Sequence, residues 1–153
     1  MTDLLQLVSA FFARNEWEHE LLDAPRALEF NHTRSGLPTK SRATITGGGP
    51  ILVYDSLCLE RVPQEHRSEV AEYLTRVNAD LPVGAFDMDW DAGEVRFRTS
   101  IDLQGEQLTD ALLRGVVLSN HQAMIDWLGH LLSVISGEMT GATAYHEARN
   151  SIG

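Results

Sequence analysis

The chain has 153 residues, 43% hydrophobic and 22% charged, values typical of one globular domain with a sizeable core. Its formal net charge is −10, and its Lys and Arg residues are scattered singly along the chain. Binding to nucleic-acid phosphates needs a basic face, so the sequence predicts no nucleic-acid partner. An acidic surface also repels anionic membranes, so no membrane partner is predicted.

The single cysteine, Cys58, excludes an internal disulfide and indicates a reducing compartment. It lies in an apolar run, which favours a buried, inert thiol over a nucleophile. The N-terminus lacks the basic segment that opens a signal peptide. Charged and polar residues interrupt the longest apolar region, 108–135, so it is not expected to span a membrane. These features together predict a cytoplasmic protein.

The N-terminal half predicts one helix followed by strands. An amphipathic helix is expected from residue 4 to Asn15, with Thr2 or Asp3 as its N-cap. Alternating apolar and polar residues then predict strands at about 17–21, 28–31, 39–46 and 51–61. The glycine run at 46–50 lacks the Gly-Lys-Ser/Thr ending of a phosphate-binding loop. It is therefore expected to form a hairpin loop before the central strand.

The second half predicts two more helices and two more strands. The helices are expected at 63–81 and 108–135, and the strands at 83–90 and 94–103. Short turns between strands favour an antiparallel sheet of about five to six strands, packed against three helices. We therefore predict a single α+β domain over residues 1–137. Residues 138–153 are polar and non-periodic, and we expect a weakly ordered tail.

The stretch D-M-D-W-D-A-G at 87–93 could form a calcium loop, with Asp87, Asp89 and Asp91 as oxygen ligands. The spacing argues against this interpretation. Ala92 stands where a calcium loop needs a turning glycine, and Arg98 stands where it needs a bidentate glutamate. The aspartates alternate with apolar residues, which favours a strand whose Asp face is exposed to water.

We expect this strand to turn at Gly93, which can adopt a positive φ. Arg96 and Arg98 on the return strand would then face Asp87 and Asp89. Aspartates that neighbour arginines on an exposed strand are not placed for general acid–base catalysis, which needs burial to separate two carboxyl pKa values.

The chain shows no recognisable catalytic constellation. Its six histidines form no H-x-x-x-H or H-E-x-x-H pair, and no serine lies in G-x-S-x-G. Asn120, His121 and Gln122 form a polar island in the apolar third helix, which we interpret as a core or interface cluster rather than a metal site. We therefore predict no enzyme, no cofactor and no bound metal.

Small residues recur every four positions on the third helix, at Gly115, Ser119 and Ala123. Glycine inside a helix costs about 1 kcal/mol relative to alanine, so a packing reason is expected. Two alternatives fit: the small residues let the helix approach its own sheet, or they form the seam of a homodimer.

The region from Val62 to Asp102 carries a family resemblance. Its features are Val62-Pro63, the V-A-E-Y-L-x-R-x-N helix, L-P-x-G-x-F, the alternating Asp strand, Gly93 and V-R-F-R. This pattern resembles the YbjN family of bacterial proteins, described as sensory-transduction regulators. The resemblance implies a fold like that of type III secretion chaperones, usually dimeric. It brings no catalytic residue, and the chain after residue 137 has no counterpart in it.

These observations favour a non-enzymatic protein-interaction module, chaperone-like or regulatory, that forms a homodimer and binds a polypeptide partner. The alternative is a regulatory domain that binds a small molecule or a divalent metal through the Asp87–Asp91 face. The candidate residues of a partner or dimer surface are Trp17, Phe86, Trp90, Gly115, Ser119 and Ala123.

Overall fold

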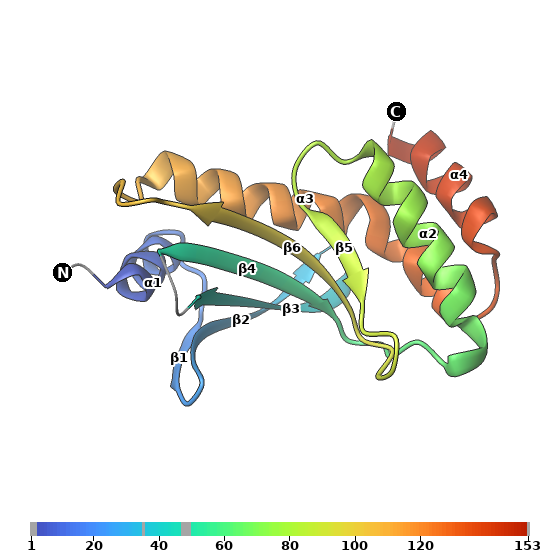
Figure 1. The fold of residues 1–153 in the computed structure, drawn as a ribbon, viewed down its shortest axis with the longest axis horizontal. Coiled ribbons are helices and arrows are strands. Elements are labelled where there is room, and N and C mark those ends of the chain that lie inside the picture. Colours follow the sequence, from blue (N-terminus) through green and yellow to red (C-terminus); the bar gives the residue numbers. More distant parts are fainter. Residues whose placement is uncertain (1–2, 35, 47–49, 153) are drawn as a thin grey trace.

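The computed structural model describes residues 3–34, 36–46 and 50–152. Over these residues the chain forms an antiparallel sheet with helices packed on it (Figure 1). The predicted α+β class is confirmed, with four α-helices where three were expected. Residues 47–49 of the glycine loop predicted at 46–50 lie outside the described residues, as does the alternative cap Thr2.

The α-helices are α1 (Leu4–Arg14), α2 (Arg67–Asp80), α3 (Asp110–Ile135) and α4 (Gly141–Ile152). A short 3₁₀ helix, Gln64–His66, precedes α2. Side-chain caps fix two of the helix starts, because they accept hydrogen bonds from backbone N–H groups that lack helical partners. Asp3 accepts from the Leu5 N–H at the start of α1, and Thr109 accepts from the Leu112 N–H at the start of α3.

The strands are β1 (Glu20–Asp23), β2 (Arg26–Arg34), β3 (Leu37–Ile45), β4 (Ile51–Cys58), β5 (Ala85–Met88) and β6 (Val95–Asp102). All neighbouring strands are antiparallel, in the order β1-β2-β3-β4-β6-β5. The last strand in sequence, β6, therefore lies between β4 and β5. This arrangement makes β1 and β5 the two edges of the sheet.

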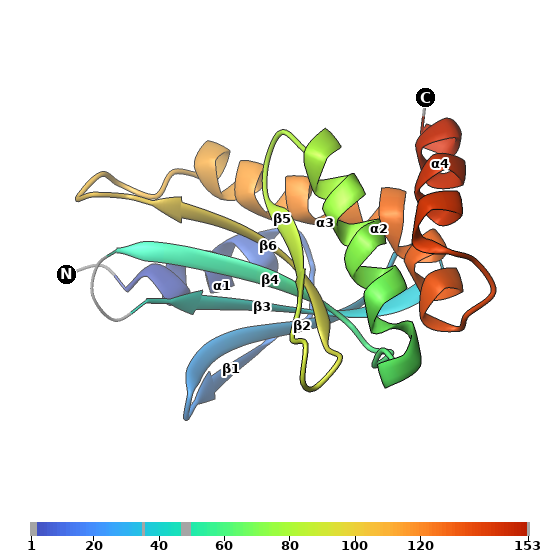
Figure 2. The same cartoon turned by 45° about the vertical axis from the view of Figure 1, so that its right-hand side comes forward.

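Helices α1, α2 and α3 pack on one face of the sheet, and α4 packs on α2 and α3 on the same side (Figures 1 and 2). Two hydrophobic clusters form the core there. One cluster joins α1 and the N-terminal part of α3 to β2, β3 and β4, with Phe12 and Tyr54 fully buried. The other joins α2, α4 and the C-terminal part of α3 to β5 and β6, with Tyr73 and Phe97 fully buried. We call the opposite side the uncovered face, because none of the described helices packs on it.

The C-terminal segment differs from the prediction of a weakly ordered tail, because residues 141–152 form α4. This helix buries Ala144, Tyr145 and Ala148 against α2 and α3. Its first N–H, on Gly141, donates to the Glu69 carboxylate at 2.8 Å. Its buried residues are Gly141, Ala144, Tyr145 and Ala148, so the sequence shows no run of large apolar residues at helical spacing. Small side chains instead allow α4 to approach α2 closely, since a Cβ at Gly141 would clash with Glu69.

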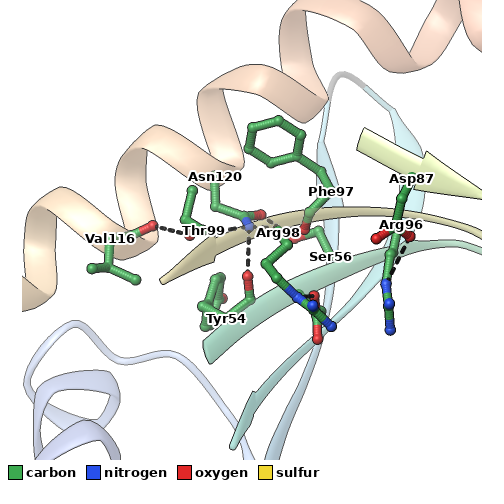
Figure 3. Close-up of polar contacts among 10 residues, drawn as sticks. Tyr54, Ser56, Asp87, Arg96, Phe97, Arg98, Thr99, Val116 and Asn120 are labelled. Carbon is green, nitrogen blue, oxygen red and sulfur yellow. Dashed lines mark hydrogen bonds and ion pairs between the residues drawn. The ribbon is translucent and has the colours of Figure 1, made fainter. Parts of the chain in front are cut away.

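The buried amide of Asn120 connects α3 to the neighbouring strands β4 and β6 (Figure 3). Its Nδ2 donates to the carbonyl oxygens of Tyr54 on β4, at 2.9 Å, and Phe97 on β6, at 3.1 Å. Its Oδ1 accepts from the Ser56 hydroxyl at 2.5 Å. Of the polar island predicted as a core or interface cluster, Asn120 and His121 are buried in the core and Gln122 is exposed. Asn120 holds α3 in register with β4 and β6.

Replacing Asn120 by Leu should lower the free energy of unfolding by about 3 kcal/mol, because buried polar groups lose their partners. Chemical denaturation measures this change. Arg114→Leu, at an exposed site on the same helix, is the matched control and should change stability by less than about 0.5 kcal/mol. An Asn120→Leu variant as stable as the control would contradict the role assigned to the amide.

Candidate functional site

A row of alternating charges crosses the uncovered face. Glu29, Arg42, Asp55 and Arg98 are successive cross-strand partners on β2, β3, β4 and β6. The Arg42 guanidinium donates to the Glu29 carboxylate, and Arg98 Nε donates to Asp55 Oδ1 at 2.9 Å. Opposite charges at directly opposed positions stabilise the pairing of strands.

The carboxylates in this row lie beneath the guanidinium groups. The side chains of Glu29 and Asp55 are only 12% and 13% exposed, whereas those of Arg42 and Arg98 are 38% and 40% exposed. The outermost layer of the row is therefore cationic, although the chain as a whole is acidic.

A second row lies beside the first. Lys40 on β3, Leu57 on β4, Arg96 on β6 and Asp87 on β5 are successive cross-strand partners. Arg96 Nε donates to Asp87 Oδ1 at 2.8 Å (Figure 3). This hydrogen bond is the main cause that raises the pKa of Arg96, which keeps the guanidinium charged.

The structure confirms one of the two predicted ion pairs and corrects the other. Arg96 pairs with Asp87, as predicted. Arg98 pairs with Asp55 rather than with Asp89. On β5 the cross-strand partner of Arg98 is Ala85, and the nearest carboxylate is on β4, on the other side of β6.

The D-M-D-W-D-A-G stretch ends β5 and forms a tight turn, as predicted. Asp89 Oδ1 accepts from the backbone N–H groups of Asp91, at 3.0 Å, and Ala92, at 2.9 Å. These two hydrogen bonds are the main causes that lower the pKa of Asp89. Gly93 has a φ of 75°, which L-residues with a side chain rarely adopt. Arg67 of α2 donates to the Trp90 and Asp91 carbonyls and ties the turn to the helix.

The Asp87–Asp91 face offers no arranged ligand set. Asp87 is engaged by Arg96, and Asp89 is engaged by its own turn. Within residues 3–34, 36–46 and 50–152, no group of three or more His, Cys, Asp or Glu side chains is placed to hold a metal ion. A cavity of about 350 Å³ opens beside these aspartates, with Leu57, Met88 and Glu94 among its lining residues.

The three aromatic candidates lie in different environments. Trp17 is half-buried and stacks on Phe30, with ring centroids 5.4 Å apart. Phe86 is buried against Phe97, so its proposed role in a contact surface is corrected to a role in the core. Trp90 is exposed at the turn after β5. The structure therefore does not bring the three rings together into one surface.

The three small residues of α3 also differ in their burial and contacts. Ala123 is buried in the core, so it serves the contact of α3 with its own domain. Gly115 is exposed, and a Cβ at this position would meet no atom within 4 Å. The half-buried Ser119 donates its hydroxyl hydrogen bond to the Gly115 carbonyl. Packing among the described residues of this chain therefore does not explain the glycine at 115.

Cys58 packs against the second core cluster, and burial raises the pKa of its thiol. This environment agrees with the inert thiol that the sequence predicted. Among the described helices, none is both long and apolar enough to cross a membrane.

Comparison with known protein families identifies the family of this chain. The model of the YbjN family, described as "putative bacterial sensory transduction regulator", matches residues 4–119. This chain belongs to the YbjN family. A similar solved structure is that of YbjN from E. coli, described as a putative transcription regulator, with a TM-score of 0.58 and 12% identity. The similarity covers 82% of this chain and 92% of that chain, and it shows the shared fold. No curated protein matches this chain.

The sequence does not predict that these charged side chains form two continuous rows. Each strand shows its part as alternation, for example Lys40 and Arg42 on either side of Ser41. The alternation identifies the polar side of a strand but does not identify its neighbours. Only the pairing of β4 with β6 shows that Asp55 and Arg98 face each other.

The lowered pKa of Asp89 predicts a specific acid sensitivity. A group whose folded pKa lies below its unfolded value of 3.8 contributes stability above that pH, and the contribution is lost as the pH falls through the folded pKa. The Asn amide oxygen in Asp89→Asn can still accept the turn hydrogen bonds but does not titrate. Thermal melts below pH 4 should therefore show a shallower loss of stability for this variant than for the native chain. Identical pH profiles would contradict this assignment.

Proposed function

We propose that this protein is a non-enzymatic regulatory module that binds a polypeptide segment on the uncovered face of its sheet. The observation that carries the proposal is the one-sided architecture: the described helices all pack on one face, and two rows of charged side chains cover the other. The regulator description of the YbjN family supports this class of function. The proposed compartment is the bacterial cytoplasm.

The edges of the sheet provide backbone N–H and C=O groups that can also bind a polypeptide segment. The edge strand β5 is shorter than β6 and pairs only with residues 95–98 of it. Among the described residues, no strand pairs with 99–102 of β6 on the side opposite β4. An extended peptide can add to such an edge through main-chain hydrogen bonds, while its side chains contact the adjoining face.

Selection from a random linear peptide library tests the proposed function. We expect peptides to be enriched on the folded protein and to compete with one another for one surface. A thermal melt with each peptide distinguishes binding to the native state, because a ligand at 100 times its Kd adds about 2.7 kcal/mol of stability. Failure to enrich any peptide that stabilises the native chain would contradict the proposal.

The second proposed partner is another copy of the chain, bound through the outer face of α3. Leu118 and Ile125 are exposed there, and both Gly115 and Gly129 have open space at the Cβ position. Positions 111, 115, 118, 122, 125 and 129 alternate steps of four and three residues, as in a coiled-coil seam. In an antiparallel pair centred on Asn120, Gly115 of one copy would lie opposite Ile125 of the other.

Gly115→Trp should convert the dimer to a monomer, because the indole would separate the two helices at this seam. The variant should keep its fold, since a Cβ at 115 meets no atom within 4 Å. Light scattering after size-exclusion chromatography measures the mass. Ala79→Trp, at an exposed position on α2, is the control and should leave the mass unchanged. A folded Gly115→Trp dimer would place the seam elsewhere.

A further inference from the structure

We infer that the uncovered face selects an acidic, extended peptide with carboxylates at alternate positions. The inference rests on the proposed function and adds the chemical class of the partner. It follows from the arrangement of four cationic side chains: Lys40 and Arg42 on β3, and Arg96 and Arg98 on β6.

These four residues lie at the corners of a rectangle. The two on each strand are separated by one residue, so their Cα atoms lie about 7 Å apart along the strand. The strand β4 lies between β3 and β6, so the two pairs are about 10 Å apart across the sheet. Asp55 and Leu57 of β4 lie between the pairs, as cross-strand partners of Arg98 and Arg96.

The guanidinium groups keep hydrogen-bonding capacity after their internal contacts are made. Arg96 and Arg98 each donate to an internal carboxylate through Nε. Across the described residues neither forms another side-chain hydrogen bond. Each guanidinium therefore has both Nη groups available, and these can donate to a ligand carboxylate. The Glu29 and Asp55 carboxylates are mostly covered, so a ligand meets Arg42 and Arg98 first. In the second row, Asp87 is exposed beside Arg96.

The distribution of charge favours an acidic ligand here. The two rows hold four cations and the three carboxylates that pair with them, Glu29, Asp55 and Asp87, so they carry a net charge of +1 in a chain of net charge −10. Alternate side chains of an extended peptide lie about 7 Å apart on one side, which matches the spacing of cations along β3 and along β6. Leu57, between Lys40 and Arg96, offers a small apolar contact to the same segment.

A nucleic acid is the competing class of anion. No residue of the two charged rows is aromatic, and the exposed Trp90 lies in the turn after β5. Stacking on aromatic rings is a major term in the binding of single-stranded nucleic acids. These properties favour the peptide.

Fluorescence anisotropy with a labelled peptide that alternates Glu with Thr tests the inference. The native chain should bind this peptide, with an affinity that falls as salt is raised. The same peptide with Gln in place of Glu should not bind measurably. Binding of the Gln peptide with equal affinity would overturn the inference, and so would tighter binding of a labelled oligothymidylate.

Matched variants locate the contact. Arg96→Gln should weaken binding of the Glu peptide about fivefold, the upper range for one exposed ion pair. Arg76→Gln removes an equally exposed, ion-paired arginine from α2 and should have no effect. Lys40→Gln provides a second test with little structural cost, because Lys40 lies 3.8 Å from Glu29, which Arg42 also binds. Unchanged affinity in both face variants, with folding confirmed by circular dichroism, would overturn the inference.

The peptide selection separates this inference from the function on which it rests. Enrichment of alternating acidic sequences supports both. Enrichment of peptides without carboxylates overturns the acidic partner and leaves the peptide-binding function in place. Enrichment of no peptide overturns the function itself.

Discussion

The pairing of β4 with β6 is the constraint on which both faces of the sheet depend. On the helix side, it brings the Tyr54 and Phe97 carbonyls close enough for one amide, that of Asn120, to bind both. On the uncovered face, the same register sets Arg98 against Asp55. A long insertion comprising α2 and β5 separates the two strands in sequence, so the site does not exist until they pair.

The division of polar contacts between the two faces has a physical reason. The Asn120 amide and the Ser56 hydroxyl on the helix side are neutral groups in a buried hydrogen-bonded cluster, which avoids the cost of burying charge. Charged groups are placed on the uncovered face, where water and opposed charges both stabilise them. The exposed arginines there can exchange part of their hydration for a ligand, whereas the Asn120 cluster has no such freedom.

Local patterns in the sequence predict most helices and strands. They do not predict contacts that depend on the pairing of strands far apart in the sequence. The stripes of apolar residues in α1 and α3, and the turn at Gly93, follow from spacing alone. The pair between Arg96 and Asp87 was predictable because one tight turn joins their strands. The pair between Arg98 and Asp55 was not predictable, because β4 lies far from β6 in the sequence. The helix α4 was missed because alanine and Tyr145 form its buried side.

The central claim is that the uncovered face, rather than the helix side, binds the partner. Methyl NMR with a spin-labelled Glu-Thr peptide tests this directly, since the label broadens signals from nearby methyl groups. The account predicts broadening of the methyl signals of Val53 and Leu57 on the uncovered face, with Leu118 and Ile125 on α3 unaffected. Broadening of the α3 methyl signals, with Val53 and Leu57 unchanged, would contradict it.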